Sequence, residues 1–192
     1  MQISLKSPLL HLFSFLYLTL SAPQLQAQEL AFKYIETSDF HNLYQLNADL
    51  YRSEQPSKKG MKDVQALGIK SVINLRRKHT DENKLKALNL DLYNIPLKAG
   101  TLDDDDIFTV LQTIQQAQKP VLIHCWHGSD RTGAIVAASR MVFENWSKDK
   151  AIAEFTDKRF GYHKKMYPNL IPLLESLDID LLKEKLAKSV KD

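Results

Sequence analysis

The sequence predicts an α/β fold with a central, mostly parallel sheet flanked by helices and a further helical cluster at the C-terminal end. Short runs of β-branched and apolar residues alternate with helix-like runs, and the last part of the chain is typical of helices. Strands separated by helices pair in parallel, because the helix returns the chain to the starting edge of the sheet. The composition, 44% hydrophobic and 26% charged in 192 residues, fits one globular domain.

Four strands are expected, each bounded by turn-forming residues. They cover 50–53, 70–75, 91–96 and 120–124. Ligands of such sheets bind outside the carboxyl ends of the strands. The end of the last strand, PVLIH, is therefore where we expect the functional site.

Helices are expected between and after these strands, over 57–67, 81–88, 104–118, 130–145, 147–159 and about 168–188. Gly68 follows the first helix, at the position where a glycine commonly ends a helix. Asp104, Asp105 and Asp106 begin the third helix, and we interpret them as its cap and first-turn acids, since the helix dipole favours negative charge there.

The N-terminus has the pattern of an export signal. The apolar run at 9–20, LLHLFSFLYLTL, follows a single positive charge at Lys6 and is too short to span a bilayer. Residues 25–27, Leu-Gln-Ala, fit a cleavage site. A buried or amphipathic N-terminal helix is the alternative, but the run has no polar face. We therefore expect a signal peptide at 1–27, a single domain at 28–192 and an exported bacterial protein, periplasmic or secreted.

Charge and cysteine content limit the classes of function. Without residues 1–27 the chain holds 25 basic and 23 acidic residues, which is too even a balance to indicate a nucleic acid or, after signal removal, a membrane as partner. Cys125 is the single cysteine, so no intramolecular disulfide can form. A lone thiol in an exported protein is unusual unless the thiol is functional, and a buried structural cysteine is the alternative, which the residues around Cys125 disfavour.

Cys125 stands at the end of the 120–124 strand, in the motif HCWHGSDRTG, and an apolar helix follows. A tight loop between a strand and a helix N-terminus can point successive backbone N–H groups at one anion, helped by the helix dipole. We expect this loop to bind a phosphate group. The expected phosphate-binding residues are Trp126, His127, Gly128, Ser129, Asp130 and Arg131.

Each side chain of the motif has a chemical reason to be there. N–H donors and Arg131 stabilise a thiolate at Cys125, which makes it a nucleophile near neutral pH. The planar fork of Arg131 fits two phosphate oxygens. Gly128 lets the loop turn without a side chain that would collide with the bound group. Thr132 can donate its hydroxyl to the sulfur when phosphocysteine breaks down, and His124 can orient the loop by bonding its backbone.

These residues resemble the cysteine-dependent protein tyrosine phosphatase superfamily, whose signature is His-Cys-x5-Arg-Ser/Thr. The segments YRSEQP at 51–56 and SVINLR at 71–76 are similar to early strands of its small dual-specificity-like and inositol-phosphate-like members. The resemblance implies a cysteine-phosphatase fold, no metal or other cofactor, and phosphate transfer through Cys125. A non-catalytic phosphate-binding module is the alternative from another class. Metal binding by 124–127 is disfavoured, because adjacent residues do not easily converge on one tetrahedral ion.

The general acid stays open between two aspartates. The resemblance implies an acid on a loop upstream of the cysteine, where PLKAGTLDDDD lies at 96–106, but the usual Trp-Pro-Asp pattern is absent. Asp103 is the first candidate on that loop. Asp130, inside the signature, resembles certain bacterial members with Asp-Arg-Thr-Gly, and its other role would be to accept backbone N–H bonds.

The expected partner is a small-molecule phosphate ester. The combination of export, a compact single domain and this signature resembles the bacterial phosphatases of the tyrosine-phosphatase type that act on inositol polyphosphates such as phytate. Protein phosphotyrosine, or a dual-specificity substrate, is the alternative. Oligomeric state is not indicated by the sequence. Cations available for neighbouring phosphates are Arg76, Arg77 and Lys98, with Arg52, Lys78, Lys164 and Lys165 as further candidates.

Overall fold

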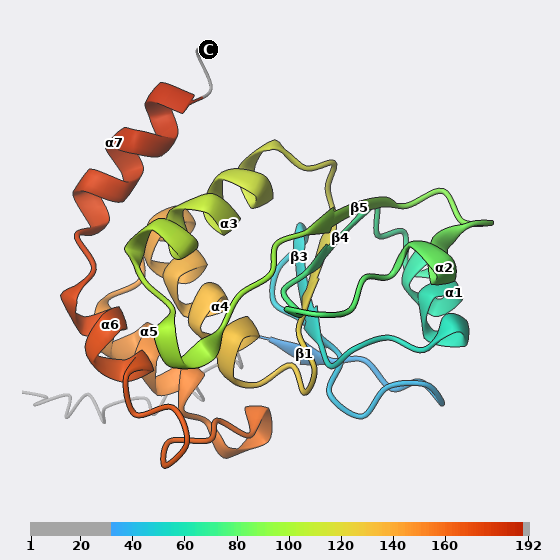
Figure 1. Ribbon diagram of the computed structural model, residues 1–192, viewed down its shortest axis with the longest axis horizontal. Coiled ribbons are helices and arrows are strands. Elements are labelled where there is room, and N and C mark those ends of the chain that lie inside the picture. The colour runs from blue at the N-terminus through green and yellow to red at the C-terminus, as the bar shows by residue number, and fades with distance from the viewer. Residues whose placement is uncertain (1–31, 190–192) are drawn as a thin grey trace, which may run out of the picture.

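The computed structural model describes residues 32–189, and the expected signal peptide at 1–27 lies outside them. This part of the chain forms a six-stranded sheet in the order β1-β2-β3-β6-β4-β5 with helices on both faces (Figure 1). The strands are β1 (Lys33–Tyr34), β2 (Tyr44–Gln45), β3 (Leu50–Ser53), β4 (Ser71–Asn74), β5 (Asp91–Asn94) and β6 (Val121–His124).

The helices also follow the expected order along the chain. They are α1 (Lys58–Ala66), α2 (Glu82–Leu85), α3 (Asp104–Gln116), α4 (Asp130–Phe143), α5 (Lys148–Phe155), α6 (Leu170–Ser176) and α7 (Ile179–Ser189), with 3₁₀ helices at Ala99–Thr101 and Lys158–Phe160. Within residues 32–189, no helix has both the length and the apolar character needed to cross a membrane.

The parallel part of the sheet positions the functional loop. β6 lies between β3 and β4, and His124 at its end is in register with Ser53 and Asn74. Because these parallel strands end together, the loops that follow them leave the sheet at one edge. β1 and β2 extend the sheet in antiparallel pairing and were not predicted, since two-residue strands are too short for a periodic pattern.

Alternate residues of β6 pack into two separate cores. Val121 and Ile123 join the core under α3 to α7, whereas Leu122 packs into the core under α1 and α2. Figure 1 shows α1 and α2 on one side of the sheet and the longer helices on the other. α4 is buried along most of its length, which explains the apolar runs at 134–138 and 141–143 in its sequence.

Some helix boundaries confirm the prediction and others correct it. Ser57 caps α1 by accepting from two backbone N–H groups, and Gly68 beyond its end has φ +81°, as expected for a left-handed terminator. The helix expected at 168–188 is two helices. Its break lies at Asp178, whose Oδ1 accepts from the Leu181 N–H and starts α7 as a new helix.

The cap of α3 is also corrected. Asp103 has extended backbone and its Oδ1 accepts from the Asp106 N–H at 2.9 Å, so Asp103 is the N-cap. Asp104, Asp105 and Asp106 form the first turn. The cap role that we assigned to those three residues from the sequence therefore belongs to Asp103.

Candidate active site

The loop between β6 and α4 joins the carboxyl end of a buried strand to the N-terminus of a helix. Cys125 follows β6 directly and is buried, and the first helical bond of α4 runs from Gly133 N–H to the Ser129 carbonyl at 2.7 Å. The N–H groups of the first turn have no partner within the helix, and the positive end of the helix dipole faces the same region. The cysteine therefore lies where negative charge is stabilised.

Gly128 is required by the neighbouring strand. Its φ is +73°, and a Cβ there would lie 2.5 Å from the backbone of Ser53 and 2.7 Å from the amide nitrogen of Glu54. The loop thus packs directly on the end of β3. In this structure the absence of a side chain at Gly128 makes room for the backbone at the end of β3.

Arg52 supports this loop from below. It is fully buried, donates from Nη2 to the Gly128 carbonyl at 2.6 Å, and stacks on Phe160 with its Cζ 3.9 Å from the ring centre. Burial lowers the pKa of Arg52 to about 10, although the charges of Glu154 and Cys125 oppose the shift. Arg52 is therefore not the surface cation that we considered from the sequence, because β3 points it into the core.

Arg131 lies at the start of α4 beside a cavity. Its Nη1 donates to the carbonyls of Leu75 at 3.1 Å and Leu97 at 3.4 Å, which ties the guanidinium to the loops after β4 and β5. The cavity has a volume of about 360 Å³. Its lining residues are Arg77, Leu97, Lys98, Ala99, Gly100, Arg131 and Tyr167. The structure thus brings Arg77 and Lys98 together with the expected phosphate clamp.

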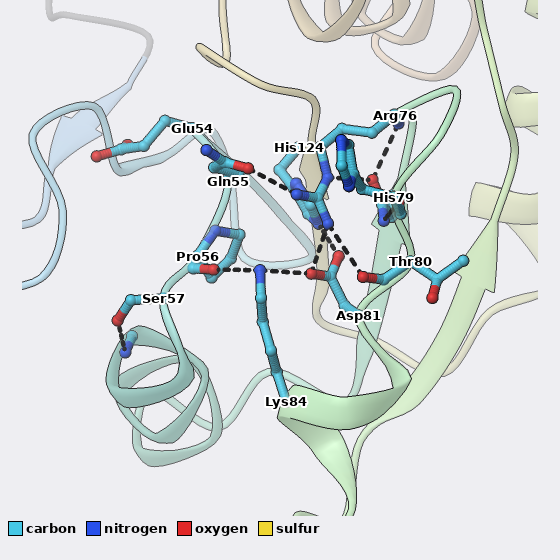
Figure 2. Close-up of polar contacts among 12 residues, drawn as sticks. Glu54, Gln55, Pro56, Ser57, Arg76, His79, Thr80, Asp81, Lys84 and His124 are labelled. Carbon is cyan, nitrogen blue, oxygen red and sulfur yellow. Dashed lines mark hydrogen bonds and ion pairs between the residues drawn. The ribbon is translucent and has the colours of Figure 1, made fainter.

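Arg76 has a different place from its neighbour Arg77. It is buried, and its guanidinium donates to Asp81 Oδ1 at 2.7 Å and to Gln55 Oε1 at 2.6 Å (Figure 2). The side chain of Asn74 accepts from its backbone N–H and its Nε. Because these protein groups hold it inside the molecule, the expectation of a surface phosphate contact at Arg76 is corrected.

Asp81 is a buried acid of the site that the sequence did not indicate. Its side chain is completely buried, yet Arg76, Lys84 and His124 surround it, with Lys84 Nζ at 2.7 Å from Oδ1 and His124 Nε2 at 3.0 Å from Oδ2 (Figure 2). Burial by itself raises the pKa of Asp81, but the contacts with His124, Lys84 and Arg76 outweigh it and lower the pKa to about 2.

His124 links this acid to the cysteine loop. Its Nδ1 lies 3.0 Å from the carbonyl oxygen of Cys125, so the ring bonds the backbone of the loop as we expected. No feature of the sequence around Asp81 pointed to its partner, because Asp81 lies between β4 and α2 whereas His124 ends β6.

Both candidate acids make specific contacts in the fold. Asp103 is exposed and caps α3, and Asp130 is buried and accepts from the backbone N–H of His163 at 2.8 Å and from its Nδ1 at 2.9 Å. His163, which the sequence did not single out, thereby lies at the site with its ring centre 5.6 Å from that of His127. At the start of α3, burial of the Asp106 carboxyl raises its pKa, and the nearby charge of Asp103 raises it further.

The remaining motif residues form the rim and the floor of the loop. Trp126 is 46% exposed, and its ring centre lies 5.9 Å from that of His79 and 6.4 Å from that of His127. Ser129 and Thr132 are buried, and no residue of the described chain hydrogen-bonds the Thr132 hydroxyl. Among residues 32–189 no three acidic, histidine or cysteine side chains are arranged to hold a metal ion.

Comparisons of the sequence find phosphatases. The model of the tyrosine phosphatase family matches residues 34–192. Dual specificity protein phosphatase TpbA of Pseudomonas aeruginosa is 34% identical over 122 residues, which cover 62% of this chain and 56% of TpbA. Inositol diphosphatase DSP5 of Arabidopsis thaliana is 27% identical over 123 residues, covering 59% of this chain and 60% of DSP5. The chain thus spans less than two thirds of the length of these curated relatives.

Comparisons of the structure confirm the predicted fold class. A crystal structure of P. aeruginosa TpbA has a TM-score of 0.74 at 29% identity, covering 83% of this chain and 98% of that one, and TpbA has also been crystallised in complex with pTyr. The catalytic core domain of the PP-IP phosphatase SIW14 from S. cerevisiae has a TM-score of 0.69, covering 80% of this chain and 96% of that one. At 22% identity, the latter shows a likeness of fold alone.

Proposed function

Since this chain belongs to the tyrosine phosphatase family, we propose that it hydrolyses phosphate monoesters through a phosphocysteine intermediate. The observation that carries the proposal is the buried Cys125 in a loop that ends at Arg131 and the N-terminus of α4. The thiolate attacks phosphorus, so that an S–P bond forms while the ester P–O bond breaks and the leaving oxygen takes a proton. Water then attacks the phosphocysteine, which breaks the S–P bond and releases inorganic phosphate.

Two contacts support the assigned roles of the motif. The carbonyls of Leu75 and Leu97 fix one nitrogen of Arg131, which leaves the rest of the planar fork for phosphate oxygens. The buried hydroxyl of Thr132 has no hydrogen-bond partner among the described residues, which suits a donor to sulfur in the second step. We retain Asp103 and Asp130 as candidates for the acid, with Asp130 acting together with His163.

For the substrate we propose an inositol polyphosphate. The cavity beside Arg131 contains two further cations, Arg77 and Lys98, and a ligand with phosphates on neighbouring carbons can use all three. The relative DSP5, named an inositol diphosphatase, supports this substrate class. A ligand with a single phosphate needs only Arg131.

A phosphotyrosine protein is the second candidate substrate, because the rim of the cysteine loop is aromatic. Trp126 presents an exposed aromatic face beside His79 and His127, and such a surface suits the ring of a phosphotyrosine. The relative TpbA is named a dual specificity protein phosphatase.

The covalent step is tested by Cys125→Ser. We expect turnover to be abolished while phosphate still binds, because the loop geometry survives and the thiolate does not. Phosphate release measures the first effect and calorimetric titration with inorganic phosphate the second. In the wild type, acid quenching during turnover should trap phosphate on Cys125. Near wild-type activity of the variant would falsify the covalent mechanism and favour a binding module.

The substrate class is tested by phosphate release from phytate, a phosphotyrosine peptide and a nucleotide. We expect phytate to be the best substrate, and Lys98→Ala to weaken phytate hydrolysis more than peptide hydrolysis. Trp126→Ala is the matched rim variant, and it should have the opposite selectivity. A wild-type preference for the peptide, lost in Trp126→Ala, would select the second candidate.

Export remains part of the proposal, resting on the apolar run at 9–20 and the cleavage pattern at 25–27. N-terminal sequencing of the protein from a bacterial host tests it. The expected first residue is Gln28, and an intact Met1 in the mature protein would contradict the signal peptide.

A further inference from the structure

Four consecutive carbonyls of the cysteine loop are hydrogen-bonded by groups that lie outside the loop. The carbonyls belong to Cys125, Trp126, His127 and Gly128. Their partners are, in the same order, Nδ1 of His124 at 3.0 Å, the Gln55 N–H at 3.1 Å, Nδ2 of Asn42 at 2.9 Å and Nη2 of Arg52 at 2.6 Å. These partners come from β6, from β3 and the residues after it, and from the segment before β2.

The N–H groups of the same peptides are left unbonded. Those of residues 126–129 donate no hydrogen bond within the part of the chain that the structure describes. In a trans peptide the carbonyl of one residue and the N–H of the next point in opposite directions, and these peptides are trans. Carbonyls held outward therefore turn the N–H groups toward the inside of the loop, where they can meet one anion.

The two peptides that flank Gly128 differ from the others in how they are held. Glycine accepts backbone angles of either sign, so the chain itself does not prevent these two peptides from turning over. They carry the His127 and Gly128 carbonyls, and the side chains of Asn42 and Arg52 bind them. The preceding peptide is held by a backbone group instead, the Gln55 N–H.

Stability does not explain the position of Arg52. Its side chain is fully buried, and its Nε and Nη1 have no hydrogen-bond partner in the described chain. Burial lowers its pKa to about 10, which leaves the guanidinium charged at neutral pH. A buried charge with unbonded N–H groups costs stability. The group that it does bond is the Gly128 carbonyl, while Phe160 stacks on the guanidinium.

Asn42 has the same pattern on the other side of the glycine. Its Nδ2 donates to the His127 carbonyl, whereas its Oδ1 is buried with no hydrogen-bond partner among the described residues. Its backbone N–H donates to Glu54 Oε2 at 3.0 Å. Glu54 directly follows β3, at the strand end on which Gly128 packs. Asn42 is thus fixed to the same strand end as the loop.

We propose that Asn42 and Arg52 are positioning residues of the phosphate site. Asn42 directs the Gly128 N–H, and Arg52 directs the Ser129 N–H, toward the bound phosphate. Each side chain acts through the carbonyl on the far side of one peptide, so neither needs to touch the substrate. This role rests on the proposed function, but binding of inorganic phosphate tests it without any turnover.

The test is the ¹H–¹⁵N NMR spectrum of the protein with and without saturating inorganic phosphate. An N–H group that donates to a phosphate oxygen moves downfield in the proton dimension. Saturation removes differences in affinity, so that the shift reports the direction of each N–H group. In the wild type we expect the amides of residues 126–129 to move downfield together.

Two variants separate the two donors. Asn42→Leu removes one donor without adding charge and keeps the approximate size of the side chain, and the Gly128 amide should lose most of its phosphate-induced shift while Ser129 keeps its own. Arg52→Met should have the reverse effect. Calorimetric titration should show phosphate binding weakened at least about tenfold in each variant, as expected for one lost hydrogen bond to a charged group. If Arg52→Met does not fold, Asn42→Leu decides alone, because Asn42 is only half-buried.

Asn47→Leu is the matched control. Asn47 also donates its side-chain amide, to Glu144 Oε1 at 2.8 Å, but it lies beyond the other end of β3. This variant should lose stability in urea and keep the phosphate affinity and the amide shifts of the wild type.

Three outcomes would overturn the proposal. They are an unchanged Gly128 shift in Asn42→Leu, an equal loss of shift at all four amides, which indicates general loosening of the loop, and wild-type Gly128 and Ser129 amides that do not respond to phosphate. Phosphate binding without hydrolysis of any ester by the wild type would instead contradict the proposed function, and the amide shifts would still test the two positioning residues.

Discussion

Two arginines and a histidine lie at the loop of Cys125, and each is fixed by a different part of the fold. Arg52 comes from β3 and is buried beneath the loop, Arg131 comes from α4 and opens to a cavity, and His124 immediately precedes the cysteine. A mobile cation would adjust to the substrate only after binding. Fixed cations avoid this reorganisation, which is how preorganised sites stabilise charge that develops during a reaction.

The general acid is a question of single residues, and leaving-group dependence distinguishes the candidates. An activated aryl phosphate leaves as a stabilised phenolate that hardly needs a proton, whereas an inositol alkoxide needs one. Removing the true acid should reduce alkyl phosphate hydrolysis by ~10²–10⁴-fold and aryl phosphate hydrolysis far less. We expect this in Asp130→Asn or in Asp103→Asn, measured with both ester types over a range of pH.

His163 refines this test, because Asp130 holds its imidazole. If the proton reaches the substrate through His163, then His163→Asn and Asp130→Asn should have the same leaving-group dependence. Asp105→Asn is the control, since Asp105 is an exposed first-turn acid of α3. Equal losses on both ester types in all these variants would exclude the candidates, and His127 would be tested next.

At the scale of elements, three parallel strands that end together assemble the site. Register brings the loops after β3, β4 and β6 to one edge, where the Gln55 N–H donates to the Trp126 carbonyl and the Leu75 N–H donates to the His124 carbonyl. The cysteine loop is therefore held by backbone bonds from both neighbours. The conformation of the cysteine loop therefore depends on how β6 pairs with β3 and β4.

Gly128→Ala tests that dependence on the sheet. The methyl group would collide with the backbone of Ser53 and Glu54 at a φ that favours glycine, so we expect ~1–3 kcal/mol or more of lost stability and weakened phosphate binding. Urea unfolding and calorimetric titration with phosphate measure these losses. Gly100→Ala is the control for stability alone, because a Cβ there meets no atom within 4 Å and φ is not positive, while Gly100 also lines the cavity at Arg131. Wild-type stability and phosphate binding in Gly128→Ala would show that the loop conformation does not depend on its packing against β3.

At the scale of the whole molecule, the buried Asp81 makes stability depend on acid pH. Its pKa is about 2 in the folded protein, against an ordinary value of 3.8. A carboxyl with a lowered folded pKa stabilises the fold above its unfolded pKa, and this contribution is lost as pH falls through the folded value. Thermal melting should therefore show a loss of ~2 kcal/mol between about pH 4 and about pH 2, absent in Asp81→Asn.

A surface acid serves as the comparison for that loss. The contact with Arg159 lowers the pKa of Asp157 to about 2, but that pair lies at the surface, where water and salt screen it. Asp157→Asn should leave most of the acid dependence in place. If both variants reduce the pH dependence of stability equally, burial of Asp81 is not the source of that pH dependence.

The sequence by itself determined the parts of the protein that depend on neighbouring residues. The succession of β6, cysteine loop and α4, the cap at Ser57 and the terminator at Gly68 all arise from local patterns. The resemblance in the motif around Cys125 also led to the family that the comparisons show. Backbone geometry within one turn or one strand is decided by adjacent residues, so these features are readable along the chain.

Only the tertiary structure decided which charged residues are buried and which reach the site. Arg76 and Arg77 are adjacent in sequence, yet one is enclosed by Asp81 and Gln55 while the other lines the cavity at Arg131. Asp81 meets His124, and Asp130 meets His163, across long stretches of chain. Such contacts depend on strand order and register, because these bring separate loops to one edge, and no local pattern in the sequence records which loops will meet there.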